Sequence, residues 1–124
     1  LTSGSNLRND IQTVSLYDYA LKELRNTGLK SLGQIIGDYV TTGVGTNLNT
    51  GTVIGSHCNL SSIGFPPRYI PSFSFGEYPS LRAFDFEKAY AVACAWISLK
   101  NQQIPENLRQ SMEEIWKADT SFRN

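Results

Sequence analysis

The 124-residue chain lacks several features that would assign a function class directly. It has no excess charge, because eleven basic residues balance eleven acidic ones, whereas a general nucleic-acid binder needs a basic surface to displace counterions from phosphate. No apolar run approaches the roughly 20 residues that a membrane-spanning helix requires. The two cysteines, Cys58 and Cys94, have neither metal-binding nor redox spacing and are too few for a disulfide scaffold. We therefore expect no nucleic-acid, membrane or metal partner.

Glycine is missing from one part of the chain. All ten glycines lie within residues 1–76, and the last 48 residues contain none. Residues 1–76 carry Asn, Thr and β-branched residues, which are typical of strands and sharp corners, whereas residues 77–124 carry Ala, Glu, Lys and Leu at helical spacing. The chain begins at Leu1, without Met and without the apolar core of a signal peptide, so we expect a piece that starts inside a longer protein.

A repeat with a period of six residues runs from Ile36 to Gly64. Its first positions are mostly aliphatic: Ile36, Thr42, Leu48, Ile54 and Leu60. Its second positions are mostly glycine: Gly37, Gly43, Asn49, Gly55 and Ser61. Its fifth positions are small or β-branched: Val40, Thr46, Thr52, Cys58 and Gly64. This pattern predicts a parallel β-helix of hexapeptide repeats, in which the first and fifth positions point inward and the second takes a corner with positive φ. The alternative is a glycine-rich loop region between ordinary strands.

The β-helix unit is predicted at residues 1–76, of which residues 1–64 supply about three coils. Upstream of the repeat, residues 13–16 are typical of a short strand, and the polar residues 18–30 are expected to form a loop projecting from a coil. So short a solenoid has two open ends and buries little surface alone. Because a three-sided prism favours three-fold packing of one face, we expect a homotrimer.

An extended exit segment is predicted at residues 64–76, which hold three of the five prolines. Proline cannot continue a hydrogen-bonded ladder, so the chain is expected to leave the β-helix here. The same segment holds four aromatic residues: Phe65, Tyr69, Phe73 and Phe75. They are expected to seal the outer wall of the solenoid; the alternative is that they stack on a sugar or an adenine ring.

Two helices are predicted in residues 77–124, where they cap or flank the solenoid. The first has Asp85 as its N-cap and ends near Lys100. Its apolar stripe comprises Phe86, Ala89, Tyr90, Ala93 and Ile97, with Cys94 and Trp96 at the margins. The second starts at Pro105 and is expected to bury Leu108, Met112, Ile115 and Trp116. Cys94 is expected to be a small core residue rather than a reactive thiol.

Three stretches of the sequence resemble one protein family. They are SNLRND (Ser5 to Asp10), LGQIIGDYVTTGVGTNLNTGTVIG (Leu32 to Gly55) and GFPPRYIPSFSFG (Gly64 to Gly76). The chain is similar to the C-terminal acyltransferase-type domain of sugar-1-phosphate nucleotidylyltransferases, the relatives of N-acetylglucosamine-1-phosphate uridyltransferase. The resemblance implies a left-handed parallel β-helix followed by two C-terminal helices, a homotrimer, a sugar phosphate as ligand and a cytoplasmic location.

The resemblance also implies a substrate-binding loop. Asn6 matches an asparagine that the family places at the amino-sugar site, and Arg8 lies in the same loop, where it could pair with a phosphate. The family's lysines fall on Gln12 and Ser15, and its catalytic histidine falls upstream of Leu1. No catalytic residue is therefore assigned, and His57 is expected to be a solvated surface histidine.

Two functions follow from these residues. In the first, the chain is the mainly structural, trimer-forming end of a sugar nucleotidyltransferase-like protein and needs no cofactor. In the second, it completes an N-acetyltransferase site that acts on an amino-sugar 1-phosphate with acetyl-CoA, shared between subunits and upstream coils. The absent lysines favour the first function. A plain protein-interaction scaffold is a third interpretation that no motif recommends.

Overall fold

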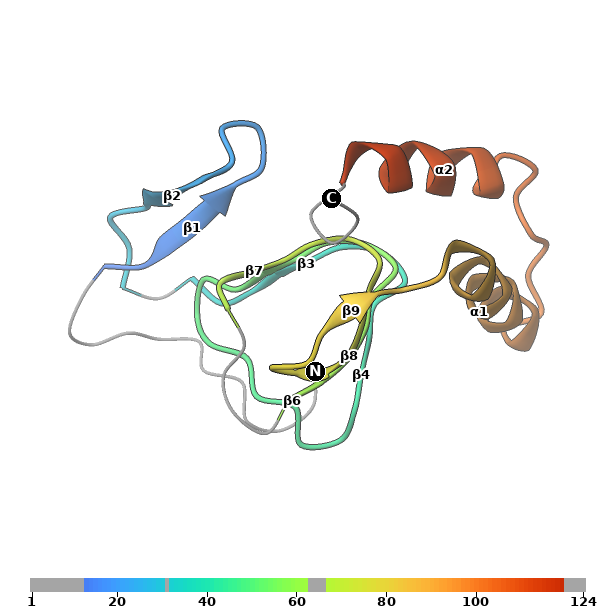
Figure 1. The fold of residues 1–124 in the computed structure, drawn as a ribbon, viewed down its shortest axis with the longest axis horizontal. Helices are drawn as coiled ribbons and strands as arrows, with labels where there is room; N and C mark the ends of the chain where they lie inside the picture. The colour runs from blue at the N-terminus through green and yellow to red at the C-terminus, as the bar shows by residue number, and fades with distance from the viewer. Residues whose placement is uncertain (1–12, 31, 63–66, 120–124) are drawn as a thin grey trace.

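The computed structural model describes residues 13–30, 32–62 and 67–119 (Figure 1). Nine short strands precede two helices in this part of the chain. The elements are β1 (Ser15–Asp18), β2 (Glu23–Asn26), β3 (Ile35–Ile36), β4 (Thr41–Thr42), β5 (Val53–Ile54), β6 (Asn59–Ser62), β7 (Tyr69–Ile70), β8 (Ser74–Tyr78), β9 (Arg82–Ala83), α1 (Phe86–Leu99) and α2 (Leu108–Ala118).

The strands form three separate sheets. β1 and β2 make an antiparallel hairpin, β3, β5 and β7 make a parallel sheet in that order, and β4, β6, β8 and β9 make a mixed sheet. The parallel pairs join residues that lie 16 or 18 positions apart, since Ile35 pairs with Val53 and Val53 with Tyr69. We call each such segment of 16 to 18 residues a pass of the chain. Successive passes lie side by side along these two sheets (Figure 1).

The predicted left-handed parallel β-helix is wrong for this part of the chain. Most strands are two residues long and none exceeds five, and the described residues form no closed or solenoid sheet. Residues 43–52, between β4 and β5, form turns and irregular backbone instead of a third ladder. The mixed sheet also ends in an antiparallel strand, because β9 turns back to pair with β8. A period of six predicts where side chains point, but the pairing of backbone groups depends on strand length and turns.

The six-residue period does predict the buried side chains. One apolar cluster consists of Leu48, Ile54, Cys58, Leu60 and Ile70, with Ile36, Val40 and Leu81 packed against it. Most members occupy first or fifth positions of the repeat, and the fifth-position residues Thr46 and Thr52 are also buried. The inward direction of these two positions is therefore confirmed.

The glycines at second positions do not adopt the predicted positive φ. Gly37, Gly43 and Gly55 have no left-handed backbone, whereas Gly45 and Gly51 do, with φ of 80° and 79°. Gly55 is required for a different reason: a Cβ placed there would lie 2.4 Å from the backbone nitrogen of Ser72. Close approach of two passes of the chain, and not corner geometry, excludes a side chain at this position.

Residues 18–30 are not only a loop, because β2 lies within them and pairs with β1 in a hairpin. The hairpin contacts the rest of the β part through Tyr17, whose ring stacks on Tyr69 at 3.9 Å between centroids. At the base of the hairpin, the Arg68 guanidinium donates hydrogen bonds to the carbonyl oxygens of Ser15 (3.3 Å) and Thr50 (3.4 Å).

The predicted exit at residues 64–76 is also corrected by the described residues 67–76. They do not leave the sheets, since they contribute β7 and the first residues of β8. Phe73 is buried, while Tyr69 and Phe75 are half-buried, so these rings pack inside the molecule. Phe65 lies outside the described residues.

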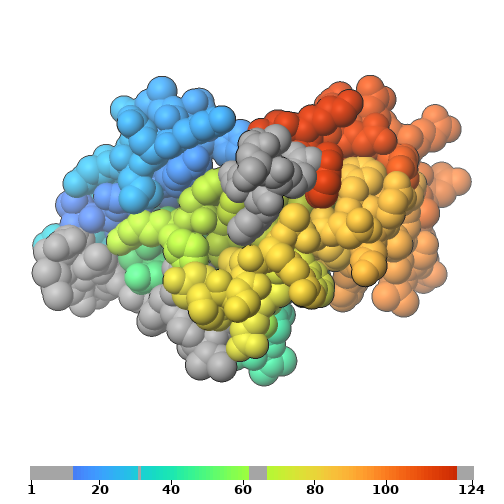
Figure 2. Space-filling view, in the orientation of Figure 1, coloured from blue at the N-terminus to red at the C-terminus, as the bar shows by residue number. Residues whose placement is uncertain are grey.

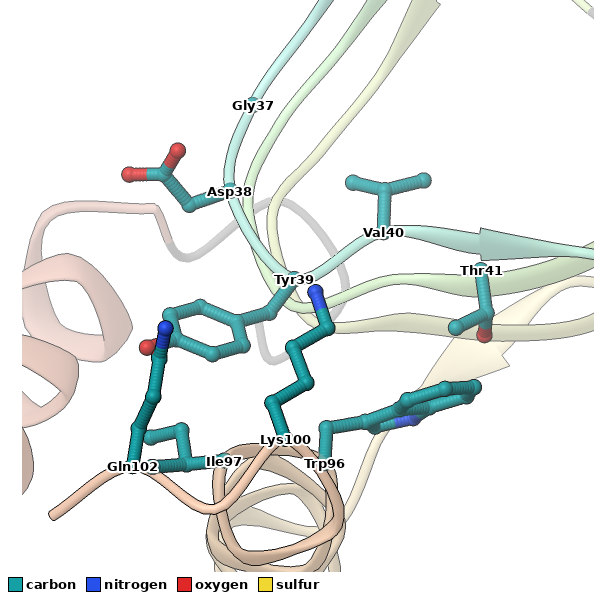
Figure 3. Close-up of a pocket in the computed structure, with 9 residues that line it drawn as sticks. All are labelled: Gly37, Asp38, Tyr39, Val40, Thr41, Trp96, Ile97, Lys100 and Gln102. Atoms are coloured by element: carbon teal, nitrogen blue, oxygen red, sulfur yellow. The ribbon is translucent and has the colours of Figure 1, made fainter. Parts of the chain in front are cut away.

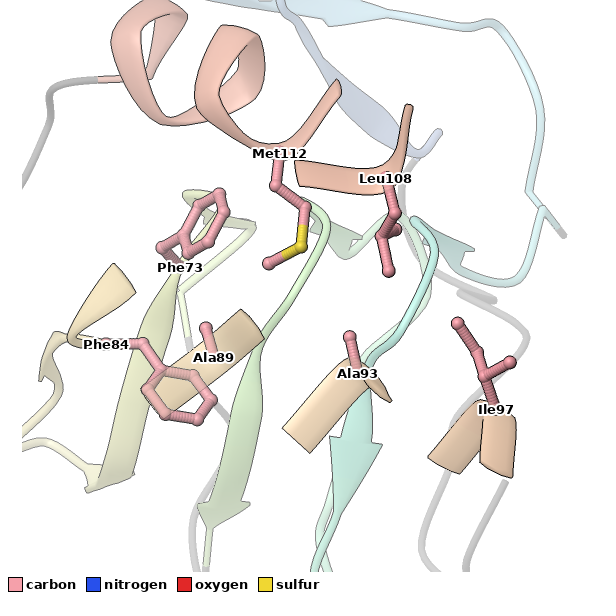
Figure 4. Packing of buried hydrophobic residues seen from close by; sticks show 7 residues of the cluster. All are labelled: Phe73, Phe84, Ala89, Ala93, Ile97, Leu108 and Met112. Atoms are coloured by element: carbon pink, nitrogen blue, oxygen red, sulfur yellow. The ribbon is translucent and has the colours of Figure 1, made fainter. Parts of the chain in front are cut away.

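Both helices lie beside the β part, and α1 lies on the opposite side of it from the hairpin (Figures 1 and 2). The N-cap prediction for α1 is confirmed, since the Asp85 carboxylate accepts a hydrogen bond from the Lys88 amide at 3.2 Å. α2 begins at Leu108, three residues after the predicted Pro105. The second apolar cluster joins the helices to the β part (Figure 4): Phe73, Phe84, Ala89, Ala93, Ile97, Leu108 and Met112.

A buried carboxylate holds the end of α2 against the β part. Asp119 is 7% exposed, and its Oδ2 atom accepts hydrogen bonds from the Tyr69 hydroxyl (2.7 Å) and the Ser72 amide (2.8 Å). Burial, together with this hydrogen bond to a carboxylate, raises the pKa of the Tyr69 phenol. The end of α2 is thus tied to β7 and to the turn that follows it.

Candidate ligand-binding cleft

A column of stacked rings crosses successive passes of the chain. Tyr39 stacks on His57 and His57 stacks on Phe73, each at 5.0 Å between ring centroids, with interplanar angles of 10° and 17°. All three residues have φ between 57° and 59°, a conformation that non-glycine residues rarely adopt. Phe73 in turn contacts Phe86 of α1 and Trp116 of α2. The column therefore links the β part to both helices.

His57 is buried inside this column, so the prediction of a solvated surface histidine is wrong. The side chain is 4% exposed, and both faces of its ring are covered. Burial lowers the pKa of the imidazole, although the nearby Asp38 carboxylate opposes this shift. The neutral ring contributes packing, and its position leaves no face open to a substrate.

Neither cysteine is placed as an exposed nucleophile. Cys58 is 1% exposed, and burial raises the pKa of its thiol to about 11, which keeps it protonated at neutral pH. Cys94 is half-buried and packs against the apolar cluster of the helices, as predicted for a small core residue. Within residues 13–30, 32–62 and 67–119, no three His, Cys, Asp or Glu side chains come together to hold a metal ion.

A cleft of about 690 Å³ lies where the turn between β3 and β4 faces the C-terminal end of α1 (Figure 3). The turn contributes Asp38 and Tyr39, and the helix and the residues after it contribute Trp96, Lys100 and Gln102. Tyr39 is 40% exposed and Trp96 is 46% exposed, so two aromatic side chains are open to a ligand. Tyr39 is also the outer end of the ring column, which fixes the orientation of its ring.

The cleft combines aromatic side chains with one carboxylate, one ammonium and one amide. Asp38 and Lys100 carry opposite charges, so the formal charge of the lining is zero. In the view of Figure 3 the Lys100 side chain extends between the rings of Tyr39 and Trp96. Such a lining can hold a small polar ligand by stacking and hydrogen bonds.

The predicted substrate-binding residues Asn6 and Arg8 lie outside the described residues. Of the two positions on which the family's lysines fall, Gln12 also lies outside them, and Ser15 begins β1 in the hairpin. Tyr39 was not among the predicted site residues, although the sequence holds a signal for it. Tyr39 and His57 both occupy the fourth position of their hexads, and two rings at one repeat position are expected to stack when successive passes pair in parallel.

No family model, curated protein or solved structure matches this chain. Membership of the nucleotidylyltransferase family therefore stays a prediction, which depends on the three sequence stretches that carry the resemblance. Among the described residues, no helix is both long enough and apolar enough to cross a membrane.

Proposed function

We propose that this chain is the C-terminal domain of a cytoplasmic sugar nucleotidyltransferase-like protein and that its main role there is structural, as a trimer-forming unit. The three sequence stretches carry the family assignment, and the burial of His57 is the observation that favours a structural role over catalysis. Acyl transfer to an amino sugar needs a general base that can reach the amine, and histidine is the residue most often used. The chain has one histidine, and its ring is covered on both faces by Tyr39 and Phe73.

Self-association is supported by apolar side chains that the single chain leaves exposed. Leu21, Leu24 and Leu29, in and just after the hairpin, are 57%, 53% and 48% exposed, and Ile35 on β3 is 49% exposed. β3 is also at the edge of its sheet among the described strands. Burying such side chains against another copy is favourable at about 25 cal/mol per Å² of apolar area. We take three as the number of copies from the family resemblance alone, because the described residues do not form the three-sided β-helix from which three-fold packing was expected.

Light scattering on the purified chain tests the assembly. We expect a mass three times the 13.8 kDa of one chain, and we expect the Leu21→Glu/Leu24→Glu variant to dissociate. Val44→Glu is the matched control, since Val44 is 99% exposed and lies away from the hairpin, in the turn after β4. A well-folded wild-type monomer would contradict the proposed assembly.

An activity assay tests the structural role against the acetyltransferase alternative. We expect the chain to transfer no acetyl group from acetyl-CoA to glucosamine 1-phosphate, because its one histidine is enclosed in the ring column and cannot reach the amine. If the full-length parent protein catalyses this transfer and loses it on Asn6→Ala, the alternative function replaces the structural one.

A further inference from the structure

We propose that the cleft between the β3–β4 turn and the end of α1 is a saccharide-binding site that takes an uncharged sugar ring. The proposal does not rest on the trimer proposed above, because the lining of the cleft includes none of the exposed apolar side chains that support self-association.

The Tyr39 ring supplies a platform for the apolar face of a sugar. One face of this ring is held by His57 at 5.0 Å, while the side chain remains 40% exposed. The C–H bonds on one face of a pyranose carry a small positive charge and are attracted to the negative face of an aromatic ring. Because the column holds Tyr39 in place, stacking a ligand on it costs little side-chain entropy.

The polar side chains of the cleft match the hydrogen-bonding groups of a sugar. Hydroxyl groups both donate and accept: the Asp38 carboxylate can accept from them, the Lys100 ammonium can donate to them, and the Gln102 amide can do both. Within the described part of the chain, no hydrogen bond or ion pair occupies these three side chains. They are therefore available to a ligand.

The charge of the cleft favours a neutral ligand over an ion. Asp38 and Lys100 offset each other, so the lining offers an ion of either sign no net attraction, while both side chains can form hydrogen bonds with a neutral polar ligand. The volume of about 690 Å³ lies within the range of small-molecule sites, roughly 300–1,000 Å³. The size of the cleft, its zero formal charge and its mixture of aromatic and polar side chains together fit a neutral sugar ring.

NMR titration of the full chain with the methyl glycosides of glucose, galactose, mannose and N-acetylglucosamine tests the site. We expect at least one glycoside to shift the indole N–H signal of Trp96 saturably in the millimolar range, while the signal of the half-buried Trp116 stays in place. Lys100→Met and Gln102→Leu should each weaken binding by about threefold or more, as expected for the loss of one hydrogen bond. Tyr39→Leu should weaken it by about tenfold through lost stacking.

Lys88→Met is the matched control, because Lys88 is an exposed lysine of the same helix that does not line the cleft. The polar variants keep the test valid if Tyr39→Leu fails to fold, since neither Lys100 nor Gln102 belongs to the ring column. The proposal is overturned if no glycoside shifts Trp96, if Lys88→Met weakens binding as much as Lys100→Met, or if ATP binds more tightly than every glycoside. A monomer in light scattering would contradict the trimer and leave this result unchanged.

Discussion

Replacing Gly55 by alanine is expected to destabilise the protein strongly, because the added Cβ meets backbone. It would lie 2.4 Å from the nitrogen and 2.7 Å from the Cα of Ser72, distances that real Cβ atoms do not adopt. The φ of Gly55 is not in the left-handed region, so alanine can take its backbone conformation. The loss of stability in Gly55→Ala therefore reports on the lack of space between two passes of the chain and not on backbone strain at residue 55.

The magnitude follows from the bonds that a local separation would weaken. The Gly55 amide donates to the Ile70 carbonyl (2.8 Å), the Ser56 amide to the Ser72 hydroxyl (2.9 Å) and the Phe73 amide to the Ser56 carbonyl (2.9 Å). Each contributes about 1 kcal/mol net, and overpacking a well-packed site costs about 1–3 kcal/mol. We expect the free energy of unfolding to fall by about 3 kcal/mol, which corresponds to roughly 12 °C in Tm.

Urea unfolding followed by circular dichroism measures this loss, with Gly43→Ala as the matched control. A Cβ at Gly43 would lie 3.2 Å from the Cβ of Ser61, so the two segments need to separate by only a few tenths of an ångström, and we expect a loss of about 1 kcal/mol or less. The double variant Gly55→Ala/Ser72→Gly should recover only part of the stability, because the backbone contact remains. Equal losses for Gly55→Ala and Gly43→Ala would refute the reasoning.

Three further predictions concern His57, Tyr69 and Cys58. The pKa of His57 is lowered in the folded state, so the unfolded chain takes up the proton first as pH falls below about 6.5. The free energy of unfolding should therefore decrease between neutral pH and pH 5. Urea titrations should show a smaller decrease for His57→Phe than for the wild type. A wild-type pH dependence equal to that of His57→Phe would argue against this. Tyr69→Phe should lower the free energy of unfolding by about 1–2 kcal/mol through the lost hydrogen bond to Asp119, and an unchanged urea midpoint would contradict that role. Cys58 should react with a thiol reagent at neutral pH far more slowly than Cys94, as mass spectrometry of the native protein can show; equal rates would mean that the core opens readily.

Local features were predictable from the sequence where neighbours along the chain decide them. Asp85 caps α1 because its carboxylate needs only the amide three residues ahead. The inward positions of the repeat, such as Ile54 and Cys58, were predictable because alternation of apolar and small residues reflects which side of the backbone is buried. The start of α2 was misplaced because proline at a first position is a preference, and the turn at residues 106–107 intervenes.

The tertiary structure alone decided the sheet pairing and the candidate cleft. Whether residues 43–52 form a third ladder depends on hydrogen bonds to other passes of the chain, which the six-residue period does not encode. His57 is buried because Tyr39 and Phe73 cover its two faces from passes 18 and 16 residues away. Tyr39 and Lys100 line the same cleft only because the ring column and the second apolar cluster hold α1 beside the β3–β4 turn. The sequence by itself thus determined which side chains of the repeat are buried. Packing between distant segments determined which residues line a common cleft, because the contacts between those segments are not contained in any local pattern.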